Sequence, residues 1–169
     1  ERLFGYIEGL GRIILTEPEA LLTEASKMPG LDGQKMSKSY NNTISLREEP
    51  ELVKQKINKM PTDPARIKLT DPGDPNKCPV WQMHKIYSSE DTLNWVTEGC
   101  TKATIGCIEC KKPIVDGINS ELAPIQEEIA KYQSNPNLIQ EIIFEGSERA
   151  RSVARDTMEE VRDAMGITY

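Results

Sequence analysis

The chain has 169 residues, of which 37% are hydrophobic and 28% are charged, and its formal net charge is -6. This composition is typical of a soluble intracellular globular protein, and the length permits one modest hydrophobic core. The longest apolar runs are too short to cross a bilayer, which argues against a membrane protein. The negative charge argues against indiscriminate nucleic-acid binding, although local basic patches can still form. We therefore expect a cytoplasmic protein with one core.

Two short helices are predicted in the first third of the chain. Thr16-x-x-Glu19 is a capping box, which predicts a helix over residues 17–25. Ser45-x-x-Glu48 is a second capping box, and apolar residues at helical spacing follow it as far as Met60. Between the two predicted helices, Pro29-Gly30 breaks the regular structure.

The remainder of the chain is predicted to be a proline-rich connector followed by helices. Residues 61–79 contain five prolines, which suits neither a helix nor a long strand. The helices that follow should begin at Pro79, after Ser89, within 111–133 and at Asn135-Pro136, and the last should be the longest. Short connections between them predict an antiparallel bundle. Trp81 and Trp95 are expected in its core, although stacking on an RNA base remains an alternative.

The run Lys35-Met36-Ser37-Lys38-Ser39, set behind Gly30-Leu31-Asp32-Gly33, is chemically suited to polyphosphate. Lysine supplies a compact mobile charge for phosphoryl oxygens, and serine adds hydrogen bonds. Glycine permits backbone conformations that other residues avoid. A solvated basic turn is the alternative interpretation of the same run.

This run, with its flanks from Pro29 to Asn42, resembles the signature loop of class I aminoacyl-tRNA synthetases, and of the tryptophanyl enzymes in particular. Thr16 through Ala25 is similar to the segment that leads into that loop, and the chain from Asn42 to about Gly166 is similar to the carboxyl-terminal part of the family. The resemblance implies an ATP-binding, Mg²⁺-dependent enzyme that activates tryptophan. It assigns Lys35 and Lys38 a catalytic role at the β- and γ-phosphates, with Met36, Ser37 and Ser39 completing the ATP-binding loop.

Enzymes of this class also need a His-x-Gly-His element that precedes the loop. The single histidine, His84, follows the loop and has no glycine beside it, so it cannot be that element. We therefore interpret the chain as a carboxyl-terminal portion without the adenine and tryptophan pockets. The predicted fold is mainly α: residues 1–60 form the tail of a Rossmann-type catalytic domain, 61–79 the connector, and 80–169 a helical anticodon-binding domain.

The cysteines form a second chemical group, with the spacing C-x21-C-x6-C-x2-C. Four thiols make one complete coordination set, and a tetrahedral sulfur site suits zinc or an iron-sulfur cluster. Four buried, unliganded thiols are the alternative. Disulfides and redox catalysis fit less well, because a synthetase works in a reducing compartment and no thioredoxin-like pattern flanks the pair. The predicted metal ligands are Cys78, Cys100, Cys107 and Cys110.

A subset of bacterial tryptophanyl enzymes carries a four-iron four-sulfur cluster with similarly spaced cysteines, so the resemblance favours that cofactor over zinc. It further implies a homodimeric ligase that binds tRNA(Trp), ATP and tryptophan. Lys111 and Lys112 flank the cysteine turn and are candidate RNA contacts. The alternative is a stand-alone metal-binding and RNA-binding module that catalyses nothing.

Overall fold

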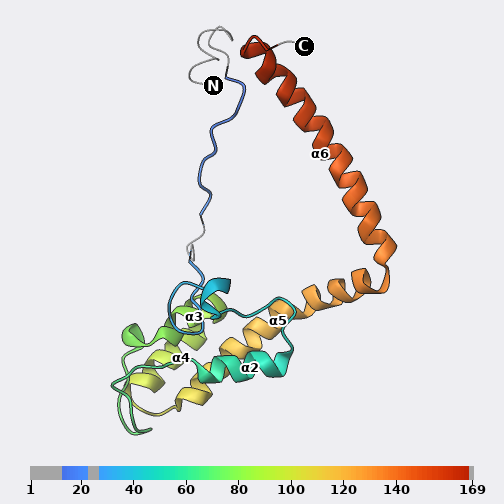
Figure 1. The fold of residues 1–169 in the computed structure, drawn as a ribbon. Coiled ribbons are helices and arrows are strands. Elements are labelled where there is room, and N and C mark those ends of the chain that lie inside the picture. The colour runs from blue at the N-terminus through green and yellow to red at the C-terminus, as the bar shows by residue number, and fades with distance from the viewer. Residues whose placement is uncertain (1–12, 23–26, 168–169) are drawn as a thin grey trace. The chain divides into compact units, whose positions relative to one another are not determined.

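The computed structural model describes residues 13–22 and 27–167, and Figure 1 shows the course of the chain. Contacts divide the chain into two units, one of residues 22–130 and the other containing the described parts of 1–21 and 131–169. Within the described residues the regular structure is helical, and the only strand-like pairing is an isolated bridge between Pro29 and Lys35. The elements are η1 (Lys38–Tyr40), α2 (Pro50–Lys59), η2 (Pro75–Lys77), α3 (Pro79–Tyr87), α4 (Glu90–Thr101), α5 (Cys107–Ser134) and α6 (Pro136–Ala164).

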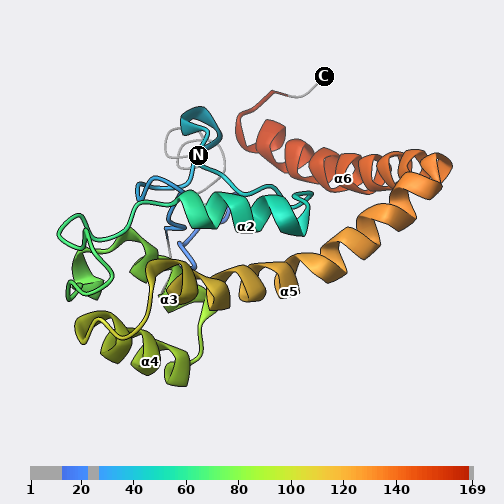
Figure 2. The ribbon, with the colours of Figure 1, turned by 90° about the horizontal axis from the view of Figure 1, so that it is seen from below.

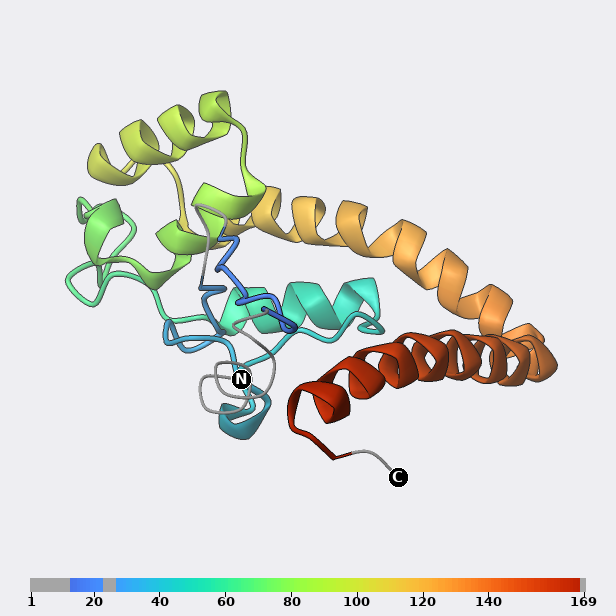
Figure 3. The ribbon, with the colours of Figure 1, turned by 90° about the horizontal axis from the view of Figure 1, so that it is seen from above.

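The unit of residues 22–130 is built on an apolar core shared by α2, α3 and α5. In Figures 2 and 3, α2 runs beside the first part of α5, with α3 next to both. Burying this apolar surface is the main favourable contribution to the stability of the unit. The core residues are Val53, Ile57 and Met60 around α2, Val80 and Met83 on α3, and Ile114, Val115, Ile118 and Leu122 on α5.

Local sequence signals explain where most helices begin. Proline occupies the first position of α2, α3 and α6, where the missing N–H needs no partner. The Ser89 side chain accepts a hydrogen bond from the Thr92 amide at the start of α4, and Asn135 does the same for the Leu138 amide at the start of α6. The mainly α prediction is confirmed for the described residues, and α5 is one continuous helix.

Two predicted helix boundaries were wrong. Described residues 17–22 are not helical, and residues 23–25 lie outside the described part. Leu21 and Leu22 are exposed, so no packing offsets the cost of nucleating a short helix. The second helix begins at Pro50 instead of after Ser45: the Glu48 carboxylate accepts a hydrogen bond from the Ser45 amide, but this contact closes a turn that precedes α2.

The unit containing 131–169 includes α6, which is seen as a continuous helix in Figure 3. Most of the large apolar side chains of α6 are on the surface among the described residues, with Ile143 and Val153 more than 60% exposed. None of the described helices combines the length and apolar character needed to span a membrane. Trp95 on α4 is also 40% exposed, so its predicted place in the core was wrong, whereas Trp81 is half-buried.

Lys111 is a buried cation that joins α5 to the end of α2. Its side chain is 2% exposed, and its ammonium donates hydrogen bonds to the carbonyls of Asn58 (2.8 Å) and Met60 (2.7 Å). These carbonyls lie at the carboxyl end of α2. The last carbonyls of a helix have no N–H donors within the helix, and positive charge is favoured there. The ammonium does not reach the surface, so the predicted RNA contact is corrected: it can apply only to Lys112, which is exposed.

Replacing Lys111 by methionine should destabilise the chain, because it keeps the side-chain length but leaves two buried carbonyls without a donor. We expect a loss of about 1–3 kcal/mol in the free energy of unfolding, measured by urea denaturation. Lys112→Met is the matched control and should change it by less than about 0.5 kcal/mol. Equal effects of the two substitutions would contradict this role for Lys111.

Candidate functional site

The lysine-containing loop is a compact turn whose base is closed by backbone hydrogen bonds. The Gly30 amide donates to the Gln34 carbonyl (2.6 Å), and the Met36 amide donates to the Met28 carbonyl (2.8 Å). Gly33 has a φ of 81°, which favours glycine, and a Cβ there would lie 2.8 Å from the Cβ of Pro79. Gly33 therefore sets the backbone conformation at the tip of the turn, and this tip packs against Pro79 at the start of α3.

The two lysines lie on either side of a serine that caps η1. The Ser37 hydroxyl accepts a hydrogen bond from the Ser39 amide (3.3 Å), which begins the short helix at Lys38. Lys35, Lys38 and Ser39 are exposed, whereas Met36 is half-buried against the core. The loop thus presents two ammonium groups and a hydroxyl to solvent from an anchored base, an arrangement that can bind phosphoryl oxygens.

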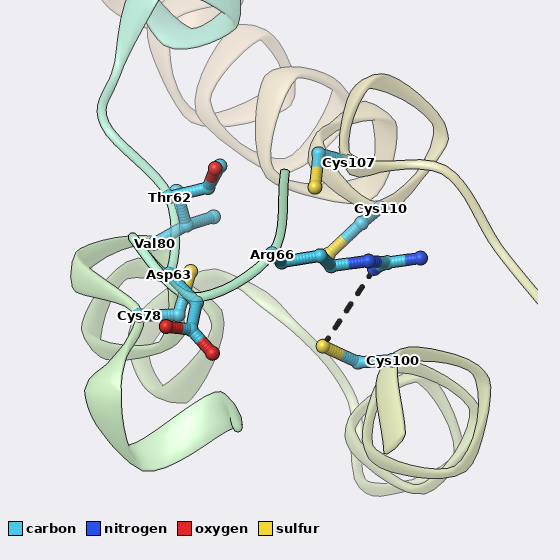
Figure 4. Close-up of a pocket in the computed structure, with 8 residues that line it drawn as sticks. All are labelled: Thr62, Asp63, Arg66, Cys78, Val80, Cys100, Cys107 and Cys110. Carbon is cyan, nitrogen blue, oxygen red and sulfur yellow. Dashed lines mark hydrogen bonds between the residues drawn. The ribbon is translucent and has the colours of Figure 1, made fainter. Parts of the chain in front are cut away.

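The four cysteines come from separate segments and line one cavity of about 20 Å³. Cys78 immediately precedes α3, Cys100 lies in α4, and Cys107 and Cys110 occupy the first turn of α5. Figure 4 shows the four sulfurs with the other lining side chains. The structure therefore brings together residues that the sequence separates by up to 32 positions.

Arg66 is the cation of this cavity, and its side chain extends across the space that Cys100, Cys107 and Cys110 border (Figure 4). Its guanidinium lies 3.8 Å from the Cys100 sulfur and donates hydrogen bonds to the carbonyls of Ile105 (2.6 Å) and Leu69 (3.2 Å). This places a fixed positive charge beside the thiols, where it favours thiolate over thiol.

Burial opposes that charge. It raises the pKa of the Cys110 thiol to about 12, and neighbouring cysteines add to the shift. Burial also raises the pKa of Cys100, while the Arg66 charge works in the opposite direction. Cys100 and Cys110 are therefore protonated at neutral pH without a metal, and metal binding to them would release protons.

The four cysteine thiols are suitable ligands for a metal, but their positions in the structure do not form a coordination site. Four sulfurs border one cavity, and 20 Å³ accommodates roughly one water-sized sphere, so a single ion suits its volume. The side chains are not gathered around a common point: within the described ranges, no group of three or more potential ligands is placed to hold a metal ion. Metal coordination would therefore require these side chains to change position.

His84 on α3 lies next to the Cys110 sulfur and is 1% exposed. One ring nitrogen, Nδ1, is 2.8 Å from the Ser88 hydroxyl, and the other, Nε2, is 3.3 Å from the Cys110 sulfur. Burial lowers the pKa of His84 from 6.5 to about 4, so the ring is neutral at pH 7. A neutral ring has one donor and one acceptor nitrogen, which matches one hydroxyl and one sulfur neighbour.

Sequence reasoning missed Arg66 and His84 as members of this region. Arg66 lies in the connector, 34 residues from Cys100, and no local pattern relates the two. His84 was considered only as a nucleotide-binding histidine. Its position in the last turn of α3, the helix that Cys78 immediately precedes, was a signal that could have placed it near the cysteines.

The buried His84 ring should make the metal-free chain sensitive to acid. Between pH 6.5 and about 4, an unfolded chain takes up a proton at this ring that the folded chain does not. Stability should therefore fall as the pH is lowered through this window, by up to roughly 3 kcal/mol. Denaturation of the chelator-treated chain at several pH values measures the slope, which His84→Gln should flatten and Lys85→Gln should not. An unchanged slope in His84→Gln would assign it to other groups.

Comparison with known proteins adds a family to this geometry. Residues 4–123 match the model of the family described as tRNA synthetases class I (W and Y). A tryptophan–tRNA ligase of Ralstonia nicotianae is 59% identical over 169 residues, which are all of this chain and 42% of that protein. The ligase of Thermotoga maritima is 46% identical over 157 residues, or 92% of this chain and 48% of that protein.

A solved structure gives the same indication. The crystal structure of tryptophanyl-tRNA synthetase from Campylobacter jejuni in complex with ADP and tryptophan has a TM-score of 0.74 and 27% sequence identity, covering 96% of this chain and 50% of that one. The chain thus spans about half the length of the relatives that it matches. Because the family match covers most of the chain, the chain belongs to the class I tRNA synthetases of the W and Y family.

Proposed function

We propose that this chain is a functional portion of a tryptophan–tRNA ligase, which activates tryptophan with ATP and transfers it to tRNA(Trp). The observation that carries the proposal is the 59% identity, over the whole chain, to a tryptophan–tRNA ligase. The exposed lysines on an anchored turn support it, because they supply the charge that a triphosphate requires. The chain's own part in the reaction is to bind the phosphates and tRNA.

In this proposal Lys35 and Lys38 bind the β- and γ-phosphates while the tryptophan carboxylate attacks the α-phosphorus of Mg²⁺-bound ATP. The bond from the α-phosphorus to the bridging oxygen breaks, and negative charge accumulates on the departing pyrophosphate. Ammonium groups held next to that charge stabilise the transition state more than the bound substrate. Ser37 and Ser39 add hydrogen bonds, and Met36 anchors the loop to the core.

We also propose that the helical part after residue 79 binds tRNA, in a ligase that works as a homodimer. Lys112 remains the candidate for a phosphate contact, because it is exposed next to the cysteine turn. The boundaries proposed for the functional domains remain 1–60, 61–79 and 80–169. A metal-binding RNA module without catalysis is the alternative, and loss of the loop lysines would not affect its RNA binding.

The third element of the proposal is a metal centre held by Cys78, Cys100, Cys107 and Cys110. Its support is the shared cavity and the complete set of four sulfur donors. Bound as thiolates, these residues would join the connector, α4 and α5 through one centre, which couples metal binding to folding. Arg66 would offset part of the thiolate charge, and His84 would face one ligand sulfur.

The ATP role is tested by exchanging the matching segment of the Ralstonia nicotianae ligase for this chain. Lys38→Ala in that chimera should slow tryptophan-dependent pyrophosphate exchange by about a hundredfold, because a charge aimed at the developing pyrophosphate is lost. The KM for tryptophan should hardly change. Lys54→Ala, which removes an exposed lysine on α2, is the control. Equal losses in rate and tryptophan binding, or no loss, would contradict the role of Lys38.

The metal is tested by anaerobic purification and analysis for iron, sulfide and zinc. About four irons and four sulfides per chain would establish the cluster, and one zinc without sulfide would establish a structural zinc site. Cys107→Ser should lower both the metal content and the melting temperature. Thr62→Ser alters the same cavity without removing a sulfur and should leave the metal content unchanged. If neither metal is found, the cysteines are buried thiols.

A further inference from the structure

Asn42 is a buried polar residue whose side chain holds the lysine-containing loop from inside. It is 3% exposed, and both ends of its amide are used. Its oxygen accepts a hydrogen bond from the Ser37 amide (2.7 Å). Its nitrogen donates to the Asp32 carboxylate (2.7 Å) and to the Lys35 carbonyl (3.2 Å). The backbone of Asn42 adds a fourth link, because its carbonyl accepts from the Leu31 amide (2.9 Å).

These bonds fix the segment that bears the two lysines. Ser37 lies between Lys35 and Lys38, and its amide and hydroxyl are both engaged, the first by Asn42 and the second by the Ser39 amide. The carbonyl of Lys35 is held by the same Asn42 amide. Releasing Asn42 would therefore free the backbone at Lys35 and at the start of η1 together. The side chains of both lysines would lose their fixed starting points.

Only an amide meets the requirements of this position. The Ser37 amide needs an acceptor, while Asp32 and the Lys35 carbonyl need a donor. The hydrogen bond from Asn42, together with one from the Gln34 amide, lowers the pKa of Asp32, so that its carboxylate stays ionised and remains an acceptor. Aspartate at position 42 would set two carboxylates against each other and would leave the Lys35 carbonyl without its donor, and a polar group left unpaired in a buried place is costly.

The space around the amide is equally restrictive. A Cβ built on Gly30 would lie 2.2 Å from the Asn42 nitrogen, far inside van der Waals contact, and the nearby atom belongs to a buried, fully bonded side chain. Gly30 is therefore needed to let the backbone approach the amide. Its φ is not in the left-handed region, so the requirement is one of space and not of backbone conformation.

From these contacts we infer that Asn42 is a positioning residue for triphosphate binding: its amide holds the loop so that Lys35 and Lys38 face the β- and γ-phosphates. The inference rests on the proposed function, because it gives Asn42 an effect on ATP that acts through the loop lysines. Asn42 itself is buried and does not touch the phosphates. Its loss should raise the KM for ATP and leave the KM for tryptophan unchanged.

The experiment uses a donor–acceptor exchange. Asn42→Asp should accelerate amide exchange at Ser37 in the 169-residue chain by about tenfold, measured by NMR, because carboxylate repulsion opens the turn. It should raise the ATP KM of the Ralstonia chimera by a similar factor. The double variant Asp32→Asn with Asn42→Asp places the donor on residue 32 and the acceptor on residue 42, and should recover most of both losses. Asn41→Asp, which adds the same charge at an exposed neighbouring asparagine, is the control.

Gly30→Ala provides a second variant that removes no polar group. It should displace the amide and give the same pair of changes, and circular dichroism of the chain verifies that each variant folds. Unchanged Ser37 exchange in both Asn42→Asp and Gly30→Ala would overturn the inference. Faster exchange with an unchanged ATP KM would also overturn it, provided that Lys38→Ala still impairs pyrophosphate exchange. If Lys38→Ala has no effect either, the proposed ATP role of the loop is what fails.

Discussion

The packing of α2, α3 and α5 around one small apolar core is the constraint on which the unit of residues 22–130 depends. Leu31 and Met36 of the lysine-containing loop pack against its edge, and so does Cys78 of the cysteine cavity. The loop and the cysteines are therefore supported by the same buried surface. Any change that loosens this core should therefore be felt at both places.

Polar contacts add to the apolar core by joining the segments around it. Lys111 satisfies the carbonyls at the end of α2, and Lys56 bridges α2 to the Thr43 carbonyl (3.1 Å) and the Glu48 carboxylate (2.6 Å). The Gln126 side chain donates to the Glu48 carbonyl (2.8 Å) and thus joins α5 to the segment that follows the loop. The bonds to the Thr43 and Glu48 carbonyls give partners to backbone groups that lie outside the helices, and they attach this segment to α2 and α5.

The features that could be predicted from the sequence are those with causes a few residues away. Pro79, Ser89 and Asn135 mark helix starts because a proline ring or a capping side chain acts on the next turn. Long-range features could not be predicted. Lysine is rarely buried, and the burial of Lys111 depends on the end of α2 meeting α5, about 50 residues apart in sequence. The number and spacing of the four cysteines suggested that they act together, and they do line one cavity, whereas no local pattern indicated the guanidinium of Arg66 among them.

Because Gly33 contacts Pro79, the lysine-containing loop and the cysteine cavity differ in the substitutions that they can tolerate. Pro79 follows Cys78 directly and begins α3, and its ring leaves no room for a side chain at position 33. A lineage could lose all four cysteines and still keep this contact, because it serves the loop and involves no sulfur. A side chain gained at position 33 would disturb the loop and the backbone of Cys78 in one step. Descendants with a reshaped loop tip must therefore repack the start of α3 at the same time.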